Sequence, residues 1–144
     1  PNPGEPLLPL SKIASGGELS RAMLALKGIL AGSDRIPTLV FDEVDAGIGG
    51  RVASVLGRKL KEIAHHHQVL CITHLAPVAA FSDSHLLVEK SGKDGRTIVR
   101  VRYLEEGKRV EELARMIGGL EVTTSAFESA KELLEDARGW TGTE

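Results

Sequence analysis

Two adjacent carboxylates, Asp42 and Glu43, directly follow the apolar run TLVF at residues 38–41. Two acids in this position can divide two tasks, because one carboxylate can hold Mg²⁺ while the other orients or deprotonates a water molecule. An acid at the end of a strand can equally be a solvent-facing loop residue. The pair alone therefore leaves both interpretations open.

A histidine, His74, closes the second apolar run, QVLCIT at residues 68–73. At the end of a strand its imidazole can donate a hydrogen bond to a phosphate oxygen, but taken alone it is better explained as a capping or core histidine. Three further histidines, His65–His67, are a weak indication of a metal site, because consecutive helical residues point in different directions. We expect these three in the last turn of a helix, where partial positive charge suits the helix dipole.

The stretch SKIASGGELSRAMLALKGIL, residues 11–30, places two glycines behind a serine at the start of a predicted helix. Ser15 and Glu18 fit the Ser-x-x-Glu capping box, in which each side chain bonds the other residue's backbone amide. Capping does not require Gly16 and Gly17, and glycine costs a helix about 0.5–1 kcal/mol relative to alanine. Bare amides at the positive end of a helix suit an anion such as phosphate. A capped helix is expected here, and a phosphate contact at its first turn stays open.

Length, charge and composition limit the classes of protein that this chain can belong to. Its 144 residues are 42% hydrophobic, which is enough for one domain with a core. A net charge of −2 and an aromatic content of 3% give neither a basic field nor a stacking platform for nucleic acid. Cys71 is the single cysteine, so no internal disulfide can form and a reducing cytoplasm is expected.

The hydrophobic runs and the two terminal segments indicate whether the chain enters a membrane and how its ends are organised. No segment reads as a transmembrane span or a secretory signal, so no membrane partner is expected. The opening PNPGEP has no initiator methionine and suggests a piece cut from a longer protein. Residues 1–10 contain four prolines and are expected to form a linker, and residues 138–144 are expected to form a tail.

Hydrophobic periodicity predicts an α/β fold. A strand, a helix and a second strand are expected at residues 38–42, 51–66 and 68–74. Both strands are short apolar runs without alternation, which indicates a parallel sheet covered on both faces. Ligands of such sheets bind at the carboxyl ends of the strands. We therefore expect the acids and His74 to share one edge of the sheet.

The C-terminal part is expected to add an antiparallel hairpin and two helices. SHLLVEKSG and RTIVRVRYL read as strands on either side of a glycine-rich turn. A short turn or helix is expected before them, at residues 75–83. The two helices are expected at residues 110–117 and 124–137, the second with an apolar face formed by Phe127, Ala130, Leu134 and Ala137.

Two earlier helices also show apolar stripes at helical spacing, which we expect to face the core. In the helix that begins near residue 16, the stripe consists of Leu19, Ala22, Met23, Leu26 and Leu30. In the helix at residues 51–66, it consists of Val52, Val55, Leu56, Leu60 and Ile63.

An apolar strand that ends in aspartate is the Walker B pattern of P-loop NTPases, but the loop that cradles the phosphates is not found. No segment matches G-x-x-x-x-G-K-[ST]; SGKDG and EGKRV lack the upstream glycine and the Ser or Thr. If a nucleotide binds here, the chain supplies only part of the site.

The order SGGE, LVFDE, VDAGIGG and ITH resembles the C-terminal half of an ABC-type ATPase head over residues 11–85. Transporters of that superfamily typically carry glutamine after the two glycines. This chain has Glu18 at that position, and in this it resembles SMC-like chromosome proteins. Four longer segments resemble the RecN family of bacterial double-strand-break repair proteins: NPGEPLLPLSKIASGGELSRAMLALK, FDEVDAGIGG, THLAPVAAFSD and ELARMIGGLEVT. This resemblance extends to about residue 137.

The resemblance implies an architecture. Residues 11–137 would form the C-terminal lobe of an ABC-type P-loop ATPase head, and the linker at 1–10 would lead from a coiled-coil arm. The P-loop would lie in an N-terminal half of the same protein, which folds together with this lobe. Two such heads would pair as a homodimer around two ATP molecules in the bacterial cytoplasm, at the nucleoid, and couple hydrolysis to DNA binding or tethering.

The resemblance also assigns roles across the paired heads. Ser15, Gly16 and Gly17 would contact the γ-phosphate of the ATP that the other head binds. Asp45 would lie in the D-loop at the seam of the dimer.

Within one head, the resemblance implies that Asp42 holds Mg²⁺ and that Glu43 is the general base for the attacking water. His74 would be the switch histidine on the γ-phosphate. The isolated chain is expected to be inactive without its P-loop-bearing half. Two other interpretations are kept: a fragment of a transporter's nucleotide-binding domain, and a head-like binding module that does not hydrolyse ATP.

Overall fold

The computed structural model describes residues 9, 14–30, 32–33, 35–93, 96–119 and 121–142. The expected linker at 1–10 lies outside the described residues except for Pro9, as do the last two residues of the expected tail. None of the described helices is long and apolar enough to cross a membrane.

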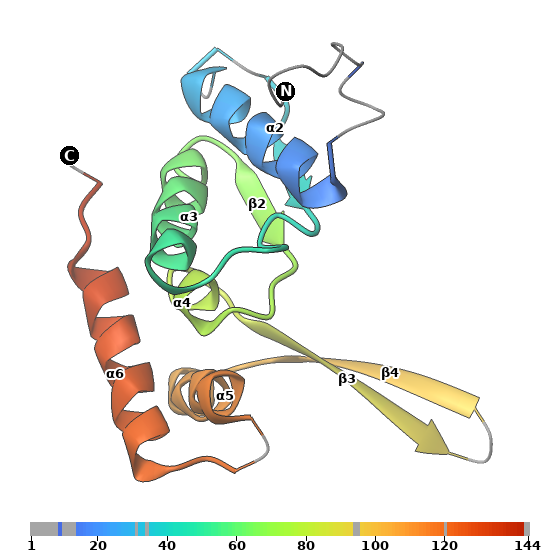
Figure 1. The fold of residues 1–144 in the computed structure, drawn as a ribbon, viewed down its shortest axis with the longest axis vertical. Coiled ribbons are helices and arrows are strands. Elements are labelled where there is room, and N and C mark those ends of the chain that lie inside the picture. Colours follow the sequence, from blue (N-terminus) through green and yellow to red (C-terminus); the bar gives the residue numbers. More distant parts are fainter. Residues whose placement is uncertain are drawn as a thin grey trace, which may run out of the picture.

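The N-terminal part of the fold is a parallel strand–helix–strand unit preceded by a helix (Figure 1). Helix α2 covers Gly16–Leu30 and strand β1 covers Thr38–Phe41. Helix α3, Gly50–Ile63, then leads to strand β2, Gln68–Cys71, which pairs with β1 in parallel. A four-residue helix α4, Ala76–Ala79, follows. The predicted α/β class, with a parallel pair of strands, is confirmed.

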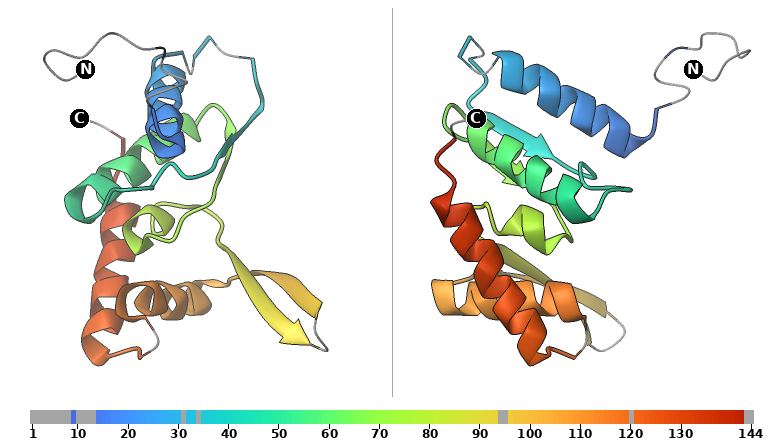
Figure 2. Two further views of the ribbon diagram at one scale, coloured as in Figure 1. Left: turned by 45° about the vertical axis from the view of Figure 1, so that its right-hand side comes forward. Right: turned by 60° about the vertical axis from the view of Figure 1, so that its left-hand side comes forward.

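The C-terminal part consists of an antiparallel hairpin and two helices, as the sequence predicts. Strands β3, Leu86–Lys93, and β4, Arg96–Tyr103, form the hairpin, which projects from the rest of the molecule in Figures 1 and 2. Helix α5 covers Glu106–Gly118, and helix α6 covers Thr124–Gly139. Helix α5 begins four residues earlier than expected (106 against 110), because the polar sequence EGKR gives no apolar period to detect.

The sheet of β1 and β2 is covered on one face only. Leu39 and Phe41 are buried against α3, together with Leu24 of α2. On the opposite face Val40 is 64% exposed and Leu70 is 47% exposed. The expectation that both faces are covered is therefore wrong for this chain, because α2 and α3 pack on the same side of the strands.

Helix α2 turns a different side to the core than its apolar stripe predicts. Its buried residues are Gly17 and Leu24. All five members of the predicted stripe are exposed: Leu19, Ala22, Met23, Leu26 and Leu30. The expectation was wrong because side-chain hydrogen bonds and a glycine contact, described below, fix this helix, whereas periodicity reports only hydrophobicity. Helix α3 shows a smaller rotation: Leu56, Leu60 and Ile63 are buried as expected, but Val52 and Val55 are exposed.

Short helix α4 connects two hydrophobic cores. Val78 belongs to the core of the parallel sheet. The alanines on the other side of α4 pack into a second core with α5 and α6, which consists of Ala76, Ala79, Ala80, Leu113, Ala114, Ala126, Ala130 and Leu134. Phe127 and Ala137 pack against this core, so the predicted apolar face of α6 is confirmed.

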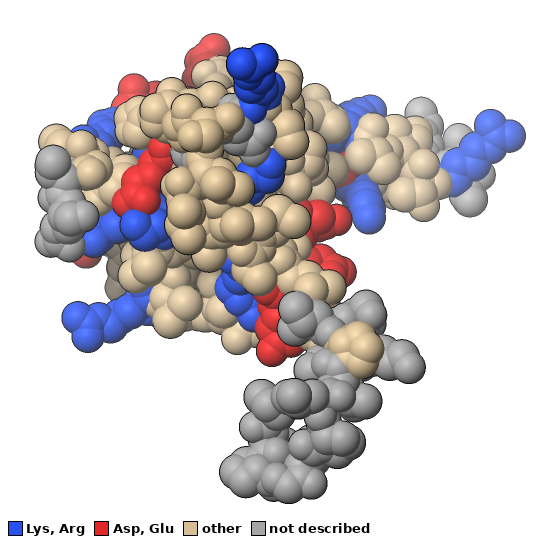
Figure 3. Space-filling model, turned by 90° about the horizontal axis from the view of Figure 1, so that it is seen from above, with Lys and Arg blue, Asp and Glu red and all other residues tan. Residues whose placement is uncertain are grey.

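On the face of the molecule seen from above, the charged side chains of the body show no single-sign field. Lysines and arginines are interspersed there with acidic side chains, whereas basic side chains predominate on the projecting hairpin (Figure 3). This distribution agrees with the small net charge of −2. That face of the body is therefore not a basic surface of the kind that attracts nucleic acid.

The contact between α3 and α4 generates a stability prediction. A Cβ on Gly57 would lie 2.6 Å from Phe81 Cδ2 and 3.1 Å from the carbonyl oxygen of Pro77. We expect Gly57→Ala to lower the free energy of unfolding by about 1–3 kcal/mol, because overpacking a tight contact forces neighbouring atoms apart. Urea unfolding followed by circular dichroism measures the change.

Gly28→Ala is the matched control, since Gly28 is also a helical glycine and its nearest atom would be 4.0 Å away. That substitution is expected to leave stability unchanged or to raise it by about 0.4–1 kcal/mol. Equal unfolding midpoints for the two variants would contradict the proposed packing of α3 on α4.

Candidate functional site

The first turn of α2 is capped as the sequence predicts. The backbone amide and the hydroxyl of Ser15 donate to Glu18 Oε2 at 2.8 Å and 2.9 Å, and the amide of Glu18 donates to Ser15 Oγ at 3.3 Å. These hydrogen bonds from Ser15 to the carboxylate lower the pKa of Glu18. The capping box is therefore formed and fixes the start of the helix beside the loop that follows β1.

The two glycines that follow the cap allow that loop to approach the helix closely. A Cβ on Gly17 would lie 2.9 Å from both the carbonyl oxygen of Glu43 and the Cβ of Ala46. A Cβ on Gly16 would overlap the carboxylate oxygen Oε2 of Glu43. The glycines thus have a role within one chain, which the sequence did not reveal: they bring the first turn of α2 against the loop that carries the acids.

Two polar side chains of α2 bind the backbone of the same loop. Arg21 Nη1 donates to the carbonyl oxygens of Val44 at 3.2 Å and Ala46 at 2.8 Å. Ser20 Oγ donates to the carbonyl oxygen of Asp42 at 2.9 Å. The sequence did not identify Ser20 and Arg21, because polar residues within a predicted helix indicate only a solvent-facing surface. Their partners are backbone carbonyls of a loop that lies more than twenty residues away. These hydrogen bonds explain why α2 turns its polar side inward.

The adjacent acids Asp42 and Glu43 are both exposed at the carboxyl end of β1. Asp42 Oδ1 accepts a hydrogen bond from the amide of Glu43 at 2.9 Å. Glu43 has a φ of 55°, in the left-handed region, and is the only described residue other than glycine with a positive φ. Such a conformation costs about 1–3 kcal/mol and is found preferentially at functional sites. The backbone is therefore strained at Glu43, directly after the end of β1.

No group of three or more metal-binding side chains gathers anywhere among the described residues. A site of that kind is not required for Mg²⁺, which usually keeps several waters and takes one or two carboxylates together with phosphate oxygens. The exposed carboxylate of Asp42 fits such a site.

Asp45 and His74 are brought together from the loops that follow β1 and β2. Asp45 is buried, and its Oδ2 accepts hydrogen bonds from Thr73 Oγ1 at 2.6 Å and from the amide of His74 at 3.1 Å. The ring nitrogen Nδ1 of His74 lies 3.1 Å from the same oxygen. The carboxylate of Asp45 is thus buried within this chain, in contact with His74. Its expected place at the seam of a dimer stays a prediction.

The expected site residues therefore meet in two groups at the same end of the sheet. Gly16 and Gly17 contact the loop at Glu43, and Asp45 holds His74. This confirms that the acids and the histidine share one edge of the sheet, since β1 and β2 are parallel neighbours. The roles of these residues toward a nucleotide remain predictions.

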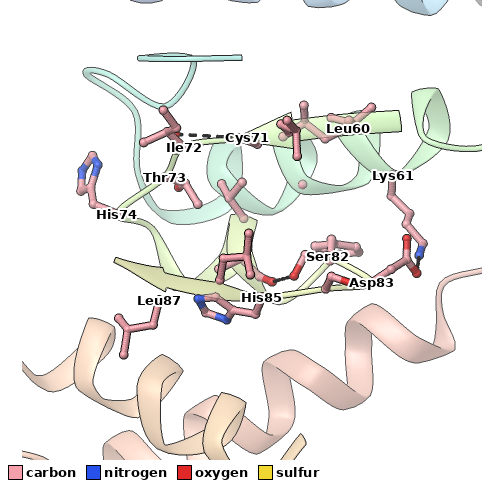
Figure 4. Close-up of a pocket in the computed structure, with 18 of the residues that line it drawn as sticks. Leu60, Lys61, Cys71, Ile72, Thr73, His74, Ser82, Asp83, His85 and Leu87 are labelled. Atoms are coloured by element: carbon pink, nitrogen blue, oxygen red, sulfur yellow. Dashed lines mark hydrogen bonds and ion pairs between the residues drawn. The ribbon is translucent and has the colours of Figure 1, made fainter. Parts of the chain in front are cut away.

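A groove of about 900 Å³ lies between β2 and the start of β3, with α5 on its far side. Figure 4 shows His74 at one end of the groove, with its ring turned away from His85. His67 and His85 also line the groove, and in the described part of the chain neither His67 Nε2 nor His85 Nδ1 has a hydrogen-bond partner. Burial is the main cause that lowers the pKa of His85, and the charge of Arg109 adds to it.

Cys71 is a half-buried residue that packs against the edge of the first core. Burial raises the pKa of its thiol to about 12, with smaller contributions from the charges of Asp45 and Asp42. The thiol is therefore protonated at neutral pH and inert as a nucleophile.

The three consecutive histidines follow α3 and do not form its last turn. The helix ends at Ile63, whose carbonyl oxygen accepts from the amides of His66 at 3.0 Å and His67 at 3.1 Å. His67 is buried, with Nδ1 2.6 Å from the carbonyl oxygen of Ile36, while His65 and His66 are exposed.

Comparison with known proteins finds close relatives over nearly the whole chain. The chain is 52% identical over 136 residues to the DNA repair protein RecN of Bacillus subtilis. The aligned region covers 94% of this chain and 24% of that protein. It is 53% identical to the RecN protein of Mycobacterium leprae over 135 residues, 94% of this chain and 23% of that protein. The matched part is the C-terminal region of these proteins. The chain thus spans about a quarter of the length of the curated relatives it matches.

Among solved structures, one from work on ATP-driven dimerization and DNA-stimulated activation of SMC ATPases has a TM-score of 0.47 and 19% sequence identity. The alignment covers 96% of this chain and 70% of that chain. No protein-family model matches the chain.

The two glycines of α2 differ in what surrounds them, and this difference can be tested. Gly17→Ala is expected to lower the free energy of unfolding by about 1–3 kcal/mol, because its Cβ would meet a backbone oxygen that cannot turn aside. Gly16→Ala is the matched control; its Cβ meets only the end of the flexible Glu43 side chain. We expect the stability of that variant to change by less than about 0.5 kcal/mol. Equal losses of stability in urea unfolding would contradict the close approach of the loop to Gly17.

Proposed function

Because nearly the whole chain is homologous to the C-terminal region of proteins named DNA repair protein RecN, we propose that it is the C-terminal lobe of an SMC-like, ABC-type ATPase head. In this proposal the complete protein acts in DNA double-strand-break repair, and ATP-driven pairing of two heads is coupled to DNA binding or tethering. The observation that carries the proposal is the identity of about half the residues, joined to an acid pair and a histidine at one end of a parallel sheet.

The proposed chemistry is hydrolysis of ATP by a water molecule that Glu43 activates as general base. Glu43 is suited to this role because its carboxylate is exposed at the strand end and its backbone is held in a strained conformation. Asp42 would hold Mg²⁺, which when bound neutralises charge on the β- and γ-phosphates. His74, also exposed, would donate a hydrogen bond to the γ-phosphate.

The first turn of α2 would complete the site of a second head. Ser15, Gly16 and Gly17 would contact the γ-phosphate bound by that head, because the amides at a helix start favour anions. One interaction with a helix dipole is worth about 0.3–1 kcal/mol. A positioned general base contributes about 10²–10⁴-fold in rate, so Glu43 should dominate the chemical step. Asp45 would lie near the seam between the heads.

The proposal also requires another part of the same protein, the portion that carries the P-loop. The uncovered face of β1 and β2 supports this, since parallel sheets occur almost only with both faces covered. Val40, Leu70 and Ile72 are exposed on that face or beside it. Two-stranded sheets are marginal by themselves. A polypeptide segment that covers this face would therefore complete the domain.

The groove between β2 and β3 supports the same partner. Among the described residues, β2 pairs only with β1 and β3 only with β4, so each strand has one unpaired edge. The groove is lined by residues of both strands. An inserted strand would pair with an edge about 4.8 Å away on each side and join the two small sheets into one. We propose that the P-loop-bearing portion supplies that strand.

The role of Glu43 predicts a separation of hydrolysis from binding. In the assembly of this chain with its P-loop-bearing portion, Glu43→Gln is expected to lower ATP turnover by about 10²–10⁴-fold, because the general base is lost. The ATP affinity of the variant, measured by isothermal titration calorimetry, is expected to equal that of the wild type. Glu62→Gln is the control, because Glu62 is a half-buried glutamate of α3 that pairs with Lys59 and lies outside the proposed site. Unchanged turnover in Glu43→Gln would contradict the role of Glu43 as general base. Bound ATP without turnover in the wild type would favour a binding module that does not hydrolyse ATP.

The open face of the sheet predicts where assembly can be blocked. Val40→Lys is expected to change the stability of this chain by less than about 0.5 kcal/mol, because the side chain is already exposed. It should abolish association with the P-loop-bearing portion, since it would bury an unpaired charge. Val55→Lys, at a 53% exposed valine on α3, is the matched control and should associate normally. Normal association of Val40→Lys, measured by size-exclusion chromatography, would show that this face is not the contact.

A further inference from the structure

The loops after β1 and β2 are joined by a single carboxylate oxygen. Asp45 Oδ2 accepts from Thr73 Oγ1 at 2.6 Å and from the backbone amide of His74 at 3.1 Å, and it lies 3.1 Å from His74 Nδ1. Thr73 Oγ1 accepts in turn from the amide of Leu75 at 3.0 Å. Asp45 Oδ2 is thus hydrogen-bonded to the backbone of His74 and lies in contact with its ring nitrogen Nδ1.

The burial of the two partners is strongly unequal. The side chain of Asp45 is 5% exposed, whereas that of His74 is 73% exposed. A buried carboxylate is costly unless it is hydrogen-bonded, and here the donors of Thr73 and His74 converge on it. An exposed imidazole, by contrast, would sample several rotamers without a partner. The contact therefore fixes the orientation of a ring that solvent would otherwise leave mobile.

The contact also favours one position of the ring proton. An ionised carboxylate can only accept hydrogen bonds, so a hydrogen bond from the ring to Asp45 requires a proton on Nδ1 of His74. In the neutral imidazole Nε2 then has no proton and cannot donate to a phosphate. In the charged ring both nitrogens carry a proton, so Nδ1 can face Asp45 while Nε2 donates to a phosphate oxygen.

We propose that Asp45 is a positioning residue for His74, which it orients so that the Nε2–H of the charged ring faces the terminal phosphate of the nucleotide. This inference rests on the proposed ATPase function of His74 and gives Asp45 a role inside its own head. It acts through His74 and does not itself touch the nucleotide. Because Asp45 follows the acid pair by two residues, the same loop that carries Asp42 and Glu43 sets the direction of the histidine.

The tautomer of His74 tests the contact without any need for catalysis. In ¹⁵N-histidine-labelled chain at about pH 8, where an ordinary imidazole is neutral, long-range ¹H–¹⁵N spectra distinguish the Nδ1–H form from the Nε2–H form. The resonances of His74 are assigned with His74→Asn, and the exposed His65 and His66 serve as internal references. The Nδ1–H form is expected for His74, and a predominant Nε2–H form in the wild type would overturn the proposal.

Variants separate positioning from a merely structural role. Asp45→Ala is expected to abolish the Nδ1–H preference, whereas Asp45→Asn should retain it, because the amide oxygen still accepts from the ring. Thr73→Val, which removes the shortest hydrogen bond to Asp45 but not the His74 contact, should also retain it. If Asp45→Ala does not fold, the wild-type tautomer and the conservative variant still decide the question. Loss of the preference in Asp45→Asn and Thr73→Val alike would point to loop structure alone.

Turnover in the assembly with the P-loop-bearing portion supplies the second readout. Asp45→Ala is expected to lower kcat about 10-fold or more, as losses of carboxylate partners of histidines do. The double variant with His74→Ala should be no slower than His74→Ala alone, because residues that act as one unit are not additive. Additive losses would contradict the proposal. Absence of turnover in the wild type would instead refute the proposed function, and the tautomer would still report on Asp45.

Discussion

The parallel pairing of β1 with β2 is the interaction on which the rest of this molecule depends. It places the loop after β1, with the acids and Asp45, beside the loop after β2, with Thr73 and His74. Because parallel strands end at the same edge, chemistry-bearing side chains that are thirty residues apart in sequence meet there without any further device. The buried carboxylate of Asp45 then ties the two loops to each other, so the pairing of the strands and the direction of His74 are parts of one arrangement.

The same pairing is incomplete by the standards of parallel sheets. One face is covered by α3 and by Leu24 of α2, and the other presents Val40 and Leu70 to solvent. The hairpin stands apart with exposed strands on both of its faces, and a groove separates it from β2. The chain spans about a quarter of the length of the curated relatives it matches. Under the proposed function, the open face, the unpaired strand edges among the described residues and the partial nucleotide motifs have one common explanation, which is a P-loop-bearing portion that packs on this lobe.

What the sequence could predict is what local interactions determine. The capping box at Ser15, the hairpin and α6 follow from neighbouring residues, and the structure forms them as expected. The orientation of α2 could not be predicted, because Arg21 and Gly17 fix it by contacts with a loop more than twenty residues away. Hydrophobic periodicity assigned the opposite side of that helix to the core; those side chains are exposed in this lobe. The contact of Asp45 with His74 was missed for the same reason, since it depends on strand register. The assignment of roles toward ATP came from family resemblance and not from periodicity.

Under the proposed function, this lobe and the P-loop-bearing portion of the same protein share one ATPase site. Steady-state ATP hydrolysis tests this sharing when it is measured for this chain alone, for the P-loop-bearing portion alone and for an equimolar mixture, each with and without duplex DNA. We expect hydrolysis in the mixture and none above background in either part. Hydrolysis by either part alone at the rate of the mixture, or none in the mixture even with DNA although the parts associate, would contradict it.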